Sequence, residues 1–117
     1  MITVRFELGT DKEFISMHMY GHAGFAEMGK DPVCAGASVM AMTVSQCIKS
    51  MEEAGKLQKR ANIIIRNGRV SVVAKPKPEY FPEALHVFYV GEVGMQLLTE
   101  AYPGNIDFTP LVTPEKA

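Results

Sequence analysis

The sequence predicts an α+β protein with one mixed or antiparallel sheet packed against two helices. Three observations support this fold class. The 117 residues are enough for one hydrophobic core but not for two. Apolar residues make up 47% of the chain and charged residues 21%, which is a globular composition. The spacing of apolar residues switches between strand and helix periods in the order β-β-α-β-β-α-β.

Two strands are predicted in the N-terminal part of the chain. Residues 2–8 alternate apolar and polar side chains, as a half-buried strand does. A turn follows at residues 9–12, and residues 14–20 alternate again. Residues 21–33 are rich in glycine and read as an irregular segment before the first helix.

The first helix is predicted over residues 35–54. Its apolar residues share one face: Met40, Val44, Cys47, Ile48 and Met51. This stripe predicts that Cys47 is an unreactive thiol in the core, because free cysteine is among the most buried residue types. Gly55 is a plausible residue to end the helix.

The second half of the chain repeats the pattern. Residues 61–66 and 69–74 are strands joined by Asn67-Gly68, a strong hairpin signal because both turn positions require a positive φ. Residues 82–101 form the second predicted helix, and residues 106–112 a final edge strand. Residues 1–117 are therefore expected to be a single domain, with 113–117 as a frayed tail.

Composition excludes several classes of function. Twelve basic residues oppose thirteen acidic ones, so no surplus of cations favours nucleic-acid binding. The sequence has no apolar run of about 18 residues to span a membrane and no recognisable signal peptide. Two cysteines are too few for a disulfide scaffold or an all-cysteine zinc site. We expect a cytoplasmic protein with reduced thiols.

Cys34 is the candidate nucleophile because it opens the first predicted helix. A helix N-terminus presents unpaired N–H groups and a positive dipole end, which stabilise a thiolate. The N–H groups around Cys34 to Gly36 could also form an oxyanion hole. The residue pattern alone leaves open a structural Cys34 that fills the helix start.

His22 ends the second strand and is the candidate general base. The irregular segment could bring it within hydrogen-bond reach of Cys34, although a solvated loop histidine remains an alternative. Asp31 and Ser38 could orient His22 or bind substrate. Their structural alternatives are an N-cap or turn residue for Asp31 and a first-turn hydroxyl for Ser38.

Other chemistry fits the sequence less well. His18 and His22 are about 13 Å apart if their strand is regular, which excludes a joint metal site with Cys34. We therefore expect no metal and no cofactor. A disulfide between Cys34 and Cys47 is excluded by their separation of about 20 Å along one helix. A non-enzymatic module that binds a peptide remains the rival to an enzyme, and residues 23–31 are expected to form a mobile lid.

Two segments resemble the ribosomal-processing cysteine protease (Prp) family: Gly21-His22-Ala23, and Lys30 to Ser38 with its Asp-Pro-Val-Cys-Ala-Gly-Ala-Ser sequence. The element order and the length are also similar. The resemblance implies a cytoplasmic protease without a cofactor, commonly a homodimer. Its substrate would be the N-terminal extension of a bacterial large-subunit ribosomal protein, the twenty-seventh of the L series, cleaved near a Phe-Phe-Ala stretch. The rival in this setting is a ribosome-associated peptide-binding module.

The resemblance also implies roles for individual residues. Cys34 becomes the nucleophile and His22 the general base, while Asp31, Ser38 and Gly21 match supporting positions. Two residues depart from the family pattern: Pro32 stands where an aliphatic residue is usual, and Gly36 where alanine is usual. Pro32 restricts the backbone beside the nucleophile and so bears on loop mobility rather than on the reaction.

The second predicted helix raises the possibility of a homodimer. Its apolar surface is wider than one sheet face requires, and Gly91 and Gly94 would let a neighbouring backbone approach. Packing within one chain is the alternative. His86 lies on the same helix without an obvious thiol partner and is assigned, like His18, to a surface or core role.

Overall fold

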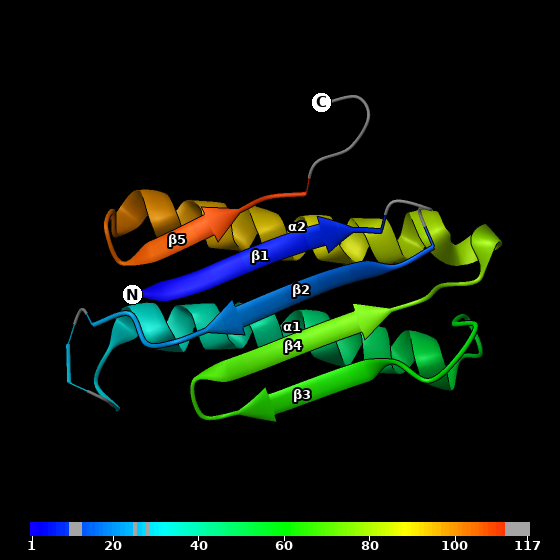
Figure 1. Ribbon diagram of the computed structural model, residues 1–117, viewed down its shortest axis with the longest axis horizontal. Coiled ribbons are helices and arrows are strands. Elements are labelled where there is room, and N and C mark those ends of the chain that lie inside the picture. The colour runs from blue at the N-terminus through cyan, green and yellow to red at the C-terminus, as the bar shows by residue number, and fades with distance from the viewer. Residues whose placement is uncertain (10–12, 25, 28, 112–117) are drawn as a thin grey trace.

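The structure of the chain is a computed structural model. It describes residues 1–9, 13–24, 26–27 and 29–111. The elements follow the predicted order β-β-α-β-β-α-β, with one additional 3-10 turn (Figure 1). Their bounds are β1 Ile2–Leu8, β2 Ile15–Tyr20, α1 Pro32–Glu53, β3 Asn62–Arg66, β4 Arg69–Ala74, η1 Pro78–Tyr80, α2 Phe81–Ala101 and β5 Ile106–Thr109.

The five strands form one mixed sheet in the order β3-β4-β2-β1-β5. Neighbouring strands are antiparallel except β1 and β5, which are parallel. Both helices lie behind the same face of the sheet, and they run in opposite directions (Figure 1). The predicted fold class is thereby confirmed.

The core lies between this sheet face and the helices. Alternate residues of the strands supply it, because successive side chains of a strand point to opposite faces. The largest fully buried side chains include Phe6, Phe88, Ile15, Met17 and Ile48. The other sheet face carries polar side chains, among them His18 and Ser71, whose Nδ1 and Oγ lie 2.6 Å apart.

The helix α1 begins at Pro32, whereas the prediction was residue 35. It starts earlier because Asp31 caps it and proline suits a first helical position. The prediction that Cys47 is buried is wrong: this thiol is exposed. The buried stripe of α1 includes Val44, Ile48 and Met51, and Cys47 lies beyond its margin. Only the side of α1 that meets the sheet and α2 is covered, so the stripe is narrower than the sequence suggests.

The C-terminal part of the chain departs from the prediction in smaller ways. The strand predicted over 106–112 ends at Thr109 as β5. Residues 112–117, including the predicted tail 113–117, lie outside the described residues, so the fraying of the tail stays a prediction. Within the described part of the chain, neither helix combines the length and apolar character that a membrane crossing requires.

Gly91 and Gly94 of α2 pack against α1 of the same chain. A Cβ at Gly91 would overlap Val44 Cγ2, and one at Gly94 would overlap the end of the Met40 side chain. The alternative of packing within one chain therefore accounts for both glycines. They allow the two helix backbones to approach closely.

We expect Gly91→Ala to destabilise the protein and Gly94→Ala to be nearly neutral. Alanine gains about 1 kcal/mol of helix propensity at either position. At Gly91 the added methyl meets the stiff, branched Val44, and overpacking costs about 1–3 kcal/mol. At Gly94 it meets the flexible end of Met40, which can move aside. Urea unfolding of both variants measures the difference, and equal stability of Gly91→Ala and the unmodified chain would contradict this packing.

Candidate active site

The predicted catalytic residues meet in a small pocket at one end of the sheet. The end of β2, the first turns of α1 and the turn between β3 and β4 come together there, on the left of Figure 1. The pocket has a volume of about 130 Å³, and both His22 and Cys34 line it. The fold thus brings His22 and Cys34 to one pocket together with residues of the β3–β4 turn.

Cys34 is the third residue of α1 and a half-buried free thiol. The backbone N–H of Ala23 donates a hydrogen bond to its Sγ over 3.2 Å. A donor aimed at sulfur, at the positive end of a helix, stabilises negative charge on that atom. The surroundings of Cys34 therefore suit a thiolate nucleophile.

Ala23 is held firmly in place for this contact. Its side chain is buried, and its carbonyl oxygen accepts a hydrogen bond from Asn105 Nδ2 over 3.1 Å. The carbonyl of Asn105 in turn accepts the N–H of Ile2 over 3.0 Å. Sequence reasoning missed Asn105, because an asparagine after Pro103-Gly104 reads as an ordinary turn residue.

His22 is exposed beside the turn between β3 and β4. A Cβ at Gly68 would lie 3.3 Å from His22 Nε2, so the imidazole rests against this turn. Among the described residues, no hydrogen bond joins the His22 ring to Cys34. Catalytic hydrogen bonds often form only when substrate binds, so His22 can act as a general base once its ring turns toward the thiol.

Gly21 shapes the end of β2 where His22 follows. Its φ is +88°, a conformation that side chains rarely adopt, and an added Cβ would lie 2.7 Å from the carbonyl oxygen of Met1. Its N–H donates to the carbonyl of Gly68 over 2.9 Å. Gly21 is therefore a positioning residue for the segment that carries His22.

Asp31 is the N-cap of α1, one of the roles that the sequence left open. Its Oδ1 accepts the N–H groups of Val33 and Cys34, and its Oδ2 accepts that of Ala26. The residue as a whole is only 5% exposed. Asp31 thus fixes both the helix start and the segment that precedes it.

This cap changes the predicted oxyanion hole. The N–H of Cys34 is bonded to the Asp31 side chain, and that of Ala35 to the Asp31 carbonyl. Because the helix begins at Pro32, two of the three expected donors, the N–H groups of Cys34 and Ala35, already have hydrogen-bond partners. The N–H of Ala23 is the backbone donor that the structure places beside the sulfur.

The two remaining candidates lie on different sides of α1. Ser38 lines the pocket one helical turn after Cys34. Gly36 faces α2, where an added Cβ would lie 3.3 Å from Leu98 Cδ1. The structure therefore places Ser38 with the site and Gly36 in the contact between the helices.

The expected absence of a metal stays a prediction, and the regular strand on which the separation of the two histidines was argued ends at Tyr20, before His22. In the described ranges, no group of three or more His, Cys, Asp or Glu side chains is arranged to hold a metal ion. His18 lies on the sheet face opposite the helices, beside Ser71, and its ring stacks on that of Tyr20.

A thiol at the start of a helix, an N–H aimed at its sulfur and an imidazole in the same pocket define a candidate thiol hydrolase. The sequence matches the family described as Cysteine protease Prp over residues 1–107. The chain belongs to this family and is a cysteine protease, as the resemblance implied. Membership favours the enzyme over the predicted rival, a module that only binds peptides.

Solved structures share the fold. A crystal structure of the ribosomal processing protease Prp from S. aureus with a covalently linked product peptide is 26% identical. It has a TM-score of 0.70, covering 94% of this chain and 99% of that one. The crystal structure of the same protease with a substrate peptide is 25% identical with a TM-score of 0.68, and it covers 94% of this chain and 99% of that one. SMU.848 from Streptococcus mutans is 20% identical with a TM-score of 0.65, covering 97% and 96%. No curated protein matches the sequence.

Proposed function

We propose that this protease removes the N-terminal extension of a large-subunit ribosomal protein, the twenty-seventh of the L series. The observation that carries the proposal is the shared pocket of Cys34 and His22 in a chain of the Prp family. The similar S. aureus protease, a ribosomal processing enzyme with solved substrate and product complexes, supports the substrate class. We place the reaction in the cytoplasm, where the thiol stays reduced.

The proposed reaction is peptide hydrolysis in two steps. His22 takes the proton of the Cys34 thiol, and the thiolate attacks the scissile carbonyl to form a C–S bond. His22 then returns the proton to the leaving amine as the C–N bond breaks. Water, activated by the same imidazole, hydrolyses the thioester and restores the thiol.

Ala23 is the backbone donor nearest to the charge that moves during this reaction. Its N–H points at Sγ before attack. When sulfur bonds to carbon, the negative charge passes to the carbonyl oxygen next to it. A donor fixed beside the sulfur is already close to this oxygen and needs no reorganisation to stabilise it. Each donor of this kind lowers the energy of the transition state by a few kcal/mol.

The predicted lid, residues 23–31, stays a prediction. Residues 25 and 28 lie outside the described part of the chain. The remaining segment has local ties, since the N–H of Ala26 donates to Asp31 and that of Lys30 to Glu27. These two bonds concern only Ala26, Glu27, Lys30 and Asp31, and ordering of a lid around a peptide is the general behaviour on which the prediction rests.

The direct test is cleavage of the extension-bearing ribosomal protein from the same genome. Mass spectrometry of the products should show one cut that releases the extension, together with a transient protein mass increased by the acyl group. An intact substrate after prolonged incubation would overturn the proposed function.

We also propose a homodimer built on the outer face of the helical layer. An apolar hollow there is lined by Val39 of α1 and Leu97 of α2, among others, and Leu97 is 61% exposed. Its lining is almost free of polar atoms at the surface, which is typical of a contact between copies. Gly94, one of the two glycines that the sequence suggested, also lines this hollow, whereas Gly91 does not.

Light scattering should give a dimer mass for the unmodified chain at micromolar concentration. Leu97→Glu should shift the mass to that of a monomer, because a carboxylate would be buried against apolar side chains. Ser50→Glu makes the same charge change at an exposed α1 position near the opposite end of the layer and should leave the dimer intact. A monomeric mass for the unmodified chain would reject the dimer.

A further inference from the structure

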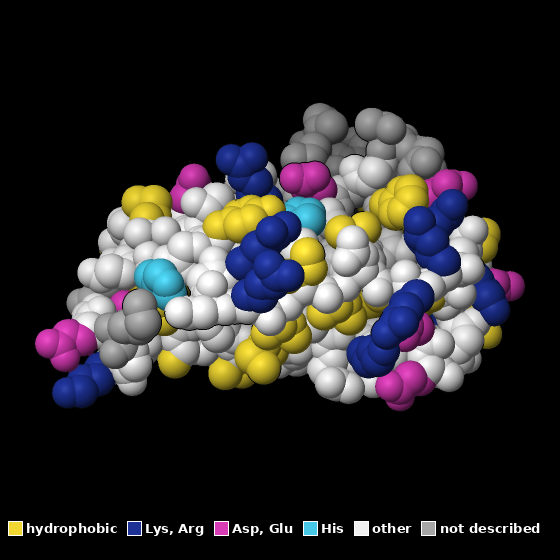
Figure 2. Space-filling model, turned by 60° about the horizontal axis from the view of Figure 1, so that its bottom comes forward, with side chains coloured by type: hydrophobic (Ala, Val, Ile, Leu, Met, Phe, Trp, Pro, Cys, Tyr) yellow, Lys and Arg dark blue, Asp and Glu magenta, His cyan; other side chains and the backbone are white. Residues whose placement is uncertain are grey.

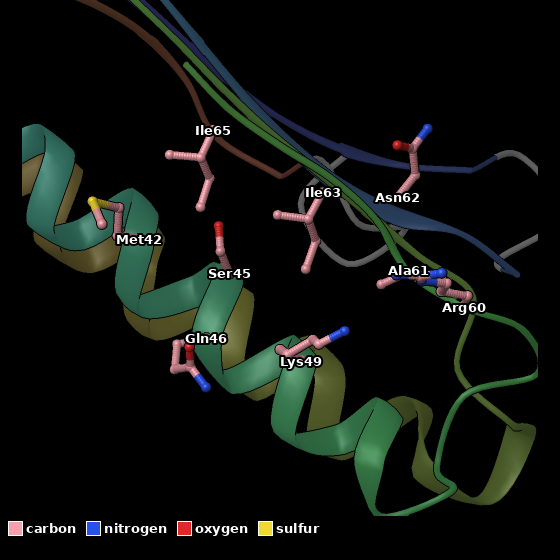
Figure 3. Close-up of a pocket in the computed structure, with 9 residues that line it drawn as sticks. All are labelled: Met42, Ser45, Gln46, Lys49, Arg60, Ala61, Asn62, Ile63 and Ile65. Atoms are coloured by element: carbon pink, nitrogen blue, oxygen red, sulfur yellow. The ribbon is translucent and has the colours of Figure 1, made fainter. Parts of the chain in front are cut away.

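A second hollow lies between α1 and the edge strand β3. Its volume is about 640 Å³. Figure 3 shows Ile63 and Ile65 pointing from the strand toward the helix, where Met42 and Ser45 face them. Ile65 is 51% exposed although it lies on the core side of the sheet. We call this hollow the α1–β3 groove.

The α1–β3 groove adjoins the candidate active site. Cys34 and Ser38 line the small pocket, and Met42, one turn further along the same side of α1, lines the groove. Residues four apart lie above one another on a helix, so the three side chains form one row. On the strand, Arg66 lines the pocket and its neighbour Ile65 lines the groove. The groove therefore continues directly from the nucleophile.

The dimensions of the α1–β3 groove suit an extended peptide. From Cys34 in the small pocket to Lys49 at the far end of the groove, this side of α1 is about 22 Å long by the helical rise. An extended chain advances about 3.3 Å per residue, so the distance corresponds to about seven residues. A substrate held at Cys34 could therefore reach the far end of the groove without bending.

The edge of the sheet offers backbone partners along the same line. Within the described ranges β3 pairs only with β4, so one side of its backbone faces away from the sheet. Extended peptides commonly bind proteins by adding a strand at such an edge, while alternate side chains fill pockets. Figure 2, which brings this side of the molecule forward, shows hydrophobic patches with Lys and Arg side chains among them.

The far end of the α1–β3 groove is basic. Lys49 and Arg60 lie there (Figure 3). Lys49 Nζ is 3.0 Å from Glu52 Oε2. The hydrogen bond from Lys49, and then the N–H of Ala61, hold the pKa of Glu52 below its ordinary value, so this carboxylate stays charged and offsets one cation. One positive charge remains, which Arg60 can present to a carboxylate of the peptide.

We infer that the α1–β3 groove is a substrate subsite within the reach of about seven residues of extended peptide on one side of the scissile bond. Apolar side chains of the peptide contact Ile63 and Ile65, and an acidic residue near the end meets Arg60. The inference rests on the proposed function for its choice of occupant. It adds that specificity depends on residues remote from the cleaved bond.

The test compares Ile65→Ser with Ile64→Ser. Ile64 directly precedes Ile65 in β3 and points to the opposite sheet face, so Ile64→Ser is a matched control. The probe is a peptide of about fourteen residues spanning the junction between extension and mature protein, roughly seven on each side. Ile65→Ser should raise KM about tenfold with little change in kcat, because contact area is lost without touching the nucleophile. Ile64→Ser should behave as the unmodified enzyme.

A second pair of variants tests the basic far end of the α1–β3 groove. Arg60→Glu should weaken binding of the same probe, and Lys77→Glu, which reverses an exposed lysine away from the groove, should not. A shortened probe with about three residues on each side cannot reach Arg60, so Arg60→Glu and Lys77→Glu should cleave it equally well. Equal KM values of Ile65→Ser and the unmodified enzyme for the long probe would overturn the subsite.

Binding separates this inference from the proposed function. Fluorescence anisotropy of the labelled long probe is measured on Cys34→Ala protein with and without Ile65→Ser. Weaker binding of the double variant supports the subsite even if the unmodified enzyme cleaves nothing, in which case only the proposed reaction fails. Equal binding by both proteins, or no binding by either, overturns the subsite whatever the cleavage assay shows.

Discussion

Cys34→Ala should lower kcat/KM for the extension-bearing substrate by about a thousandfold or more, because it removes the attacking atom. The half-buried alanine fits the start of α1 and leaves its cap in place, since Asp31 bonds to the backbone N–H groups of Val33 and Cys34. The variant should therefore unfold at nearly the same urea concentration as the unmodified chain. Loss of activity with intact stability would be assigned to chemistry rather than to folding.

Cys47→Ala is the matched control and should change kcat/KM less than about twofold, since exposed substitutions away from a site have small effects. The exposure of Cys47 also alters how a labelling experiment must be designed. Iodoacetamide can reach both thiols, so the reactivity of Cys34 has to be measured in Cys47→Ala protein. Undiminished cleavage by Cys34→Ala, or a large loss in Cys47→Ala, would contradict the assignment of the nucleophile.

The strands were the most predictable part of the fold. β1 has the predicted bounds because its burial alternates between the two sheet faces, and β4 has them because the Asn67-Gly68 turn marks where it begins. The start of α1 was less predictable. Asp31 and Pro32 are both recognised signals for a helix start, yet the neighbouring glycines favoured an irregular segment up to residue 33.

The site was predictable where a local motif carried it and not where the tertiary fold did. Cys34 and His22 follow from their positions and from the resemblance to a family. Gly68 and Asn105 reach the site from a hairpin turn and from the segment before β5, and no local pattern links them to His22 or Ala23. The burial of Cys47 was misjudged because a helical wheel shows which residues share a face but not how much of that face is covered.

The largest expected effect outside the nucleophile is at Asp31. Asp31→Ala should lower the free energy of unfolding by about 2 kcal/mol, because it removes an N-cap and leaves buried N–H groups without an acceptor. It should also lower kcat/KM, since the same carboxylate holds Ala26 in the segment between His22 and Cys34. Asp107→Ala, at an exposed position of β5, is the control and should change neither quantity.

Asp31→Asn separates the two roles of this side chain. Asparagine is as good an N-cap as aspartate, and its Oδ1 can still accept the N–H groups of Val33 and Cys34. Its amide nitrogen, however, would replace the Oδ2 that accepts the N–H of Ala26, so that two donors would face each other. We expect most of the stability to be kept while kcat/KM falls about tenfold, because small displacements of catalytic groups are costly. Full activity in Asp31→Asn would show that the Ala26 contact does not position the site, and a stability loss equal to that of Asp31→Ala would show that the cap depends on charge.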